Sequence, residues 1–365
     1  MTNAHAEAQR PALSKGGTLA RCAVIGGVLV AITGSFAYLG GWLTPKDLTP
    51  AEFADEFERV AGVHAGFRRN HAKGVGVSGF FDSNGAGARL SKATVFHVRR
   101  VPVTGRFSLA GGQPSRADAP ETIRGLGLKF SLPDGEQWRT AMNSIPVFLV
   151  KTPAAFYERL VASEPDLVTG RPDPAKMQAF LARHPEAMRA MHIISSHPPA
   201  SGFANSTYNS LNAFFFVTTA GVSTPVRLQL VPLDAFEPAA TPVSAQENKQ
   251  YLFDALIGRM QQGPVQWHLM LVVGQPSDPT NDATVPWPES RERVDAGTLT
   301  LSVVEPEETS VARDINFDPL VLPAGIVPSD DPLLSARSAV YAQSFTRRAG
   351  ETKQPSAATS AAAGK

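Results

Sequence analysis

Cysteine is nearly missing from this sequence, and its scarcity excludes several kinds of protein. The 365 residues include one cysteine, Cys22, which cannot form an internal disulfide or a multi-cysteine metal or iron–sulfur site. The chain also has almost no net charge, because its 34 Lys and Arg residues nearly balance its 33 Asp and Glu residues. Proteins that bind nucleic acid usually carry a basic excess, so we expect no nucleic-acid partner.

Long apolar runs are also scarce, and the one that occurs lies near the N-terminus. It extends from Cys22 to Leu43 without a charged residue, which is long enough to cross a bilayer as a helix. Arg10, Lys15 and Arg21 precede it, and positive charge on that side predicts a cytoplasmic N-terminus and an exported body. We therefore predict a cytoplasmic segment at 1–21 and a single transmembrane anchor at 22–43. The body would lie in the periplasm, at the inner membrane.

A cleaved signal peptide is the alternative interpretation of the same run. Ser35-Phe36-Ala37 resembles a small-residue cleavage site, and cleavage there would release a periplasmic protein that begins at Tyr38. Apolar residues continue to Leu43, which favours a retained anchor. A buried helix of a soluble domain is a third interpretation.

Glycine and proline are abundant, with 30 of each, and they favour a loop-rich fold that contains β-strands. No internal repeat and no convincing boundary divides residues 50–348, so we assign 44–348 to one domain. Residues 349–365 are rich in Ala, Ser and Thr and are predicted to be disordered.

Hydrophobic periodicity predicts an α+β fold with a largely antiparallel sheet, because the helices do not alternate regularly with the strands. Helices are predicted at 50–62, 153–163, 173–191 and around Tyr341. Strands are predicted at 94–99, 127–132, 212–218, 226–231, 265–273 and 299–304.

Two short stretches carry the residues best suited to chemistry. In Arg68–Gly74, the imidazole of His71 follows a cationic turn. In the second stretch, Tyr341 follows Arg337 by about one helical turn. A cation on the same helix face favours a phenolate, which can ligate haem iron, and an imidazole can move protons during peroxide cleavage. The pair points to peroxide chemistry.

A third pattern, Gly74-Val75-Gly76-Val77-Ser78-Gly79, matches the dinucleotide fingerprint in its letters. That fingerprint needs an apolar strand before it and a helix after it. Here Arg68–Lys73 precedes it and Phe80-Phe81-Asp82-Ser83 follows it, so no nucleotide site is predicted.

In its motifs and their order, the chain resembles the haem catalase superfamily, and within it the shorter catalase-related peroxidases. The resemblance covers about residues 50–348 and implies a catalase-like antiparallel β-barrel core with surrounding helices. The segments that carry it are Arg68–Gly74, Gly105–Ser108, Asn143–Pro146, Phe156, Arg337–Tyr341 and Arg348.

The resemblance implies a catalytic group on the distal side of the haem. His71 would be the distal acid and base, Asn143 would orient the peroxide, and Ser108 would fix the orientation of His71. Phe156 would line the same distal pocket.

The resemblance also implies the residues that hold the cofactor, haem b. Tyr341 would be the proximal ligand of the iron, and Arg337 would pair with its oxygen. Arg68, Arg106 and Arg348 would bind the haem propionates.

The function implied is a peroxidase that reduces hydrogen peroxide or organic hydroperoxides with small organic electron donors and has at most weak catalase activity. NADPH binding is not expected, because residues 209–212 depart from the family segment whose histidine contacts that cofactor. A monomer or small homo-oligomer is expected. Two alternatives are an enzyme that rearranges hydroperoxides, as allene oxide synthases do, and a haem-binding module without turnover.

Overall fold

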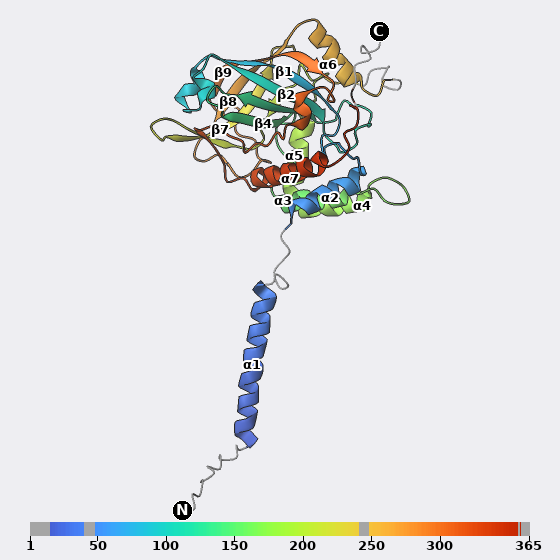
Figure 1. Ribbon diagram of the computed structural model, residues 1–365, viewed down its shortest axis with the longest axis vertical. Coiled ribbons are helices and arrows are strands. Elements are labelled where there is room, and N and C mark those ends of the chain that lie inside the picture. Colours follow the sequence, from blue (N-terminus) through green and yellow to red (C-terminus); the bar gives the residue numbers. More distant parts are fainter. Residues whose placement is uncertain (1–14, 40–47, 241–247, 357, 359–365) are drawn as a thin grey trace, which may run out of the picture. The chain divides into compact units, whose positions relative to one another are not determined.

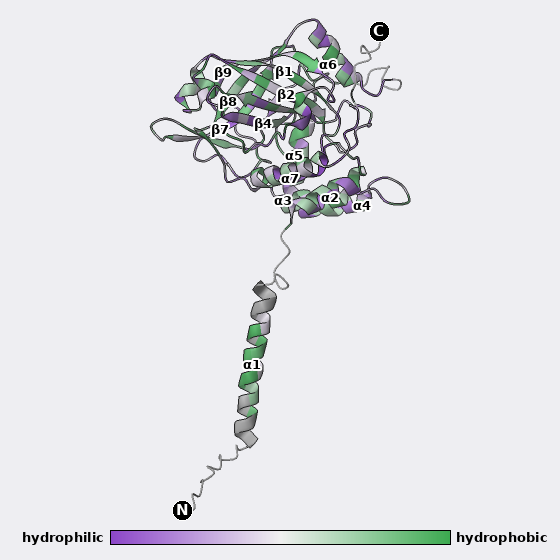
Figure 2. Ribbon diagram, in the orientation of Figure 1, coloured by the Kyte–Doolittle hydropathy of each residue, from purple (hydrophilic) through white to green (hydrophobic). Residues whose placement is uncertain are grey.

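The computed structural model describes residues 15–39, 48–240, 248–356 and 358, in two compact units, 1–49 and 50–365. In the first unit, helix α1 (Lys15–Leu39) is apolar in its middle part (Figure 2). Within the described ranges, no helix combines the length and the apolar character needed to span a membrane. The predicted transmembrane span at 22–43 is therefore unsupported, and residues 40–43 of it lie outside the described residues.

The second unit is built on a closed antiparallel β-barrel (Figure 1). The strands pair in the order β10-β6-β7-β5-β4-β3-β2-β1-β9-β8, and β7 also pairs with β8, which closes a ring that leaves out β6 and β10. The α+β prediction with an antiparallel barrel is confirmed. The strands are β1 (Gly74–Ser83), β2 (Arg100–Leu109), β3 (Arg124–Ser131), β4 (Gln137–Asn143), β5 (Tyr208–Asn209), β6 (Phe214–Val217), β7 (Ser223–Pro232), β8 (Val265–Val273), β9 (Arg293–Glu305) and β10 (Ile326–Pro328).

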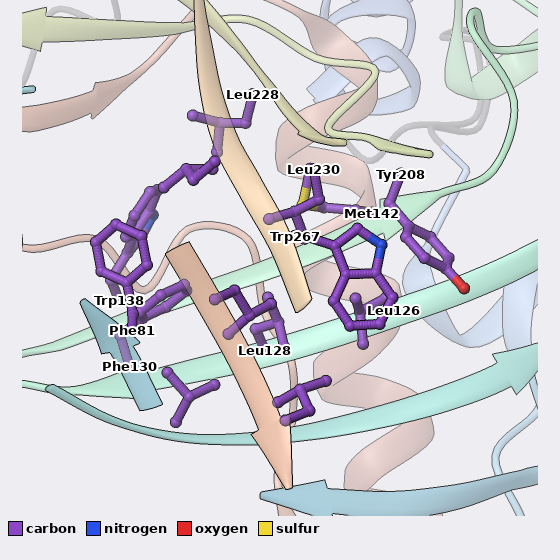
Figure 3. Close-up of a cluster of buried hydrophobic side chains, with 14 of the residues drawn as sticks. Phe81, Leu126, Leu128, Phe130, Trp138, Met142, Tyr208, Leu228, Leu230 and Trp267 are labelled. Atoms are coloured by element: carbon purple, nitrogen blue, oxygen red, sulfur yellow. The ribbon is translucent and has the colours of Figure 1, made fainter. Parts of the chain in front are cut away.

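Alternation along the strands fills the barrel with large apolar side chains. On β3, Leu126, Leu128 and Phe130 are almost fully buried and lie in one cluster with Trp138 and Trp267 (Figure 3). Successive strand residues point to opposite faces, so Gly125, Gly127 and Lys129 of β3 face away from this core. The candidate site lies on that outer face.

Most helices of this unit pack against one another beside the barrel: α2 (Pro50–Ala61), α3 (Pro153–Ala162), α4 (Pro174–Arg183), α5 (Pro185–Ser195) and α7 (Pro332–Ala349). Helix α6 (Tyr251–Gln261) instead packs against strand β9 (Figure 1). Helix α7 contacts α2 and α3. Asp331 caps the N-terminus of α7, because its side chain accepts a hydrogen bond from the backbone of Leu333 at 2.9 Å. Pro332 follows at the first helical position, where its missing N–H costs no hydrogen bond.

Two predicted elements differ from the structure. Residues 94–99 are not a strand: Thr94–Phe96 form a 3₁₀ turn, and β2 begins at Arg100. The predicted helix at 173–191 is two helices that meet at His184. Pro185 has no backbone N–H and disfavours a helical residue before it, so α4 ends there and α5 starts.

Part of the predicted disordered tail is ordered in the structure. The Glu351 carboxylate accepts a hydrogen bond from the backbone of Gly66 at 2.7 Å. Arg313 donates to the carbonyl of Gln354 at 2.7 Å. Residues 357 and 359–365 lie outside the described residues.

Candidate functional site

His71 lies in a tight turn directly before β1, with a backbone conformation that side chains disfavour. Its φ is 56°, in the left-handed region. The side chain of Asn70 supports the turn, because its oxygen accepts from the backbone N–H of His71 at 2.9 Å and of Gly111 at 2.8 Å. The turn fixes where the imidazole points.

Strands β2 and β3 supply the surface on which the imidazole rests. Its Nδ1 lies 3.1 Å from the Ser108 hydroxyl, the contact that the resemblance implies. A Cβ on Gly125 would lie 2.9 Å from ring atoms of His71 and from Oγ of Ser108, so a residue without a side chain is needed there. Sequence reasoning missed Gly125, whose signal is a glycine inside a strand.

The strand register brings Asn143 into the same row. Ser108 of β2 is opposite Gly125 of β3, which is opposite Asn143 of β4. Directly opposed residues share a face of the sheet, so Asn143 faces the side on which His71 lies. Residues of β2, β3 and β4 thus meet beside His71 on one face of the sheet.

The imidazole of His71 is held in its neutral form. Burial, together with the nearby cations Arg106, Arg337 and Arg68, lowers its pKa to about 3. At neutral pH the side chain is therefore ready to accept a proton.

Helix α7 brings Arg337 and Tyr341 together. An Arg337 nitrogen lies 3.5 Å from the Tyr341 hydroxyl. The guanidinium is fixed by a 2.8 Å bond to the carbonyl of Ala141 in β4 and by a bond to the side chain of Asn212, which in turn donates to Asp331 at 2.8 Å. Asn212 and Asp331 were not foreseen, because their link to Arg337 is made only by the fold.

The three arginines assigned to propionates gather around one acid, Glu307. Arg68 and Arg106 contact its carboxylate at 2.5 and 2.8 Å, and Arg348 lies near enough to favour its ionised form. Burial raises the pKa of Glu307, but Arg106 and Arg68 outweigh burial and hold that pKa below its ordinary value. Nε of Arg348 is buried and has no hydrogen-bond partner in the described part of the chain.

This cluster fits a ligand with two acid groups. Three guanidinium groups against one carboxylate leave two positive charges, and burying unpaired charge is costly. Burial and the neighbouring Arg106 lower the pKa of Arg68, as expected where cations crowd together. The two propionates of a haem would supply the missing negative charge.

Phe156 lies in a separate apolar cluster. Its ring packs against Phe53 of α2, Phe57 of α2 and Phe148, at centroid distances of 6.4, 6.0 and 5.6 Å. Among the described contacts of this ring, none is with His71 or Asn143. The structure thus brings His71, Ser108 and Asn143 together, and places Phe156 in an apolar cluster against α2.

Comparison with known proteins agrees with this geometry. The chain is 38% identical to a catalase-related peroxidase of Synechococcus elongatus over 301 residues, covering 82% of this chain and 89% of that protein. It is 32% identical to a catalase-related peroxidase of Mycolicibacterium paratuberculosis over 305 residues, covering 83% and 96%. A fungal catalase structure shares the fold, with a TM-score of 0.72 at 20% identity, over 79% of this chain and 60% of that one. The catalase family model matches residues 44–355, and the chain belongs to the catalase family.

Proposed function

We propose that this protein is a haem peroxidase that reduces hydrogen peroxide or organic hydroperoxides with small organic electron donors. The observation that carries the proposal is the neutral imidazole of His71 on a fixed turn, in the same unit as the Arg337–Tyr341 pair. The names of the two bacterial relatives support it. Haem, when bound, supplies the iron at which the peroxide bond is broken.

His71 would move the proton. Its Nδ1 faces the Ser108 hydroxyl, so Nε2 is the nitrogen left to accept a proton from peroxide and return it to the leaving oxygen. Asn143 would donate from its amide to a peroxide oxygen and so stabilise developing charge. These roles need the row of Ser108, Gly125 and Asn143 that the register creates.

Tyr341 would hold the haem iron through its phenolate oxygen. Arg337 places a cation 3.5 Å from the Tyr341 oxygen, where a ligating phenolate needs one. We propose haem b as the cofactor, with Arg68, Arg106 and Arg348 at the propionates and Phe156 at the edge of the distal pocket.

An absorption spectrum of the purified protein, followed by donor oxidation with hydrogen peroxide, tests the proposal. A Soret band and turnover of an aromatic donor are expected. A spectrum without haem after supplementation would contradict it. Conversion of a lipid hydroperoxide to a rearranged product without donor oxidation would favour the allene-oxide-synthase alternative.

A further inference from the structure

Glu307 is a buried acid in the loop after β9, at the centre of the cationic cluster. Its side chain is 9% exposed. One carboxylate oxygen accepts from Arg68 at 2.5 Å and from Nε of Arg106 at 2.8 Å, and the other accepts from Nη2 of Arg106 at 2.8 Å. The pairing with Arg106 is bidentate, which fixes the plane of that guanidinium as well as its position.

Arg106 connects this acid to the turn that carries His71. Its Nη1 donates to the carbonyl of His71 at 2.8 Å, and Nη2 donates to the carbonyl of Ala72 at 3.2 Å. The guanidinium lies against the backbone of Gly74, where a Cβ would come within 2.5 Å of its central carbon. The Arg106 guanidinium therefore donates four hydrogen bonds within the protein.

The turn requires such support. A residue other than glycine with φ near 56° is held in a sparsely populated conformation, which persists only when its surroundings determine it. Binding the carbonyl of His71 fixes the peptide plane that follows the residue, and so limits how the imidazole can tilt.

We propose that Glu307 is a positioning residue for His71, acting through Arg106. The proposal rests on the proposed function, because it takes His71 to be the group that moves the peroxide proton. Among the described contacts of Glu307, none is with the imidazole of His71; Glu307 binds Arg106, and Arg106 binds the backbone of the turn. Glutamine at this position would keep one acceptor but would direct an amide N–H toward a guanidinium, so the bidentate pair would be lost.

The test compares haem-loaded variants by the rate constant per bound haem for reaction with hydrogen peroxide and by the rate of cyanide binding. Glu307→Gln should slow both by about 10- to 100-fold, the scale of a misplaced catalytic group. Glu307→Asp keeps the charge but is shorter, and should fall between Gln and wild type. The rate constant for reaction of the oxidised enzyme with the donor should stay unchanged, because the donor reacts in a later step.

Asp278→Asn is the matched control. Asp278 also forms a buried bidentate pair, with Arg291 at 2.7 and 2.8 Å, and it has no contact with the His71 turn among the described contacts. Loss of that pair should lower the melting temperature without changing either rate per haem.

Equal rates per haem in wild type and Glu307→Gln would overturn the proposal, as would equal losses in Glu307→Gln and Asp278→Asn. If Glu307→Gln retains no haem, Glu307→Asp decides the question by the same comparison. A wild-type protein without haem or without a peroxide reaction would instead refute the proposed function.

Discussion

At the scale of single residues, the site depends on His71 being neutral and fixed in direction. Its pKa of about 3 keeps the imidazole unprotonated at neutral pH. Ser108 and the turn around Asn70 then determine which nitrogen is free.

Replacing His71 by alanine removes the proposed proton acceptor but leaves the side chains of Arg68, Arg106 and Arg348 unchanged. We expect the variant to retain haem and to react with peroxide about 10²- to 10⁴-fold more slowly. Stopped-flow absorption measures that rate, and an unchanged rate would remove His71 from the mechanism.

Gly125→Ala tests the space that the imidazole occupies. The new Cβ would lie 2.9 Å from the His71 ring and from the Ser108 oxygen, so the ring must move. We expect slower reaction with peroxide at normal haem content. Gly258→Ala is the control, because a Cβ on that α6 glycine meets nothing within 4 Å, and alanine is the better helix former. Equal rates in the two variants would show that the contact with β3 is unimportant.

At the scale of elements, α7 joins the proximal residues to the barrel. Tyr341→Phe removes the oxygen that would ligate iron while leaving the ring to pack. We expect loss of stable haem binding, measured from the ratio of Soret to protein absorbance. A variant with the wild-type spectrum and activity would exclude Tyr341 as the ligand.

We propose that the N-terminal helix attaches the protein to the inner membrane, with the catalytic unit in the periplasm. Its support is the uncharged run from Cys22 onward and the cations Arg10, Lys15 and Arg21 before it. In cell fractionation we expect the protein with the inner membrane, released by detergent but not by high salt. A soluble protein whose N-terminus is Tyr38 would show a cleaved signal.

The elements also show what a sequence can and cannot reveal. Arg337 and Tyr341 are neighbours on one helix, so their spacing was visible in the chain. Glu307 lies 201 positions from Arg106, and nothing local to either residue indicates their pairing. The break at Pro185 was visible in the sequence, but apolar periodicity on both sides suggested one helix. Helix α6 and strand β4 were not predicted.

At the scale of the whole molecule, we expect reduction of peroxide by a donor to be the dominant reaction, as in the two bacterial relatives named catalase-related peroxidases. Dismutation needs a second peroxide to be held in a tightly defined orientation, which is the more demanding requirement. Dye oxidation should be readily measurable and oxygen release from peroxide alone should be weak. Rapid oxygen release at an oxygen electrode with negligible dye oxidation would contradict this expectation.

The number of residue pairs that join neighbouring strands differs around the barrel. Strand β5 has two residues, and β4 is joined to it through the single pair of Asn143 and Asn209. Few strand pairs therefore hold the wall between β4 and β7, and local opening starts where few contacts hold an element. Asn143 lies in the pair that joins β4 to β5, so this part of the wall also carries an amide of the candidate site. We expect motion of the wall at this point to displace the Asn143 amide.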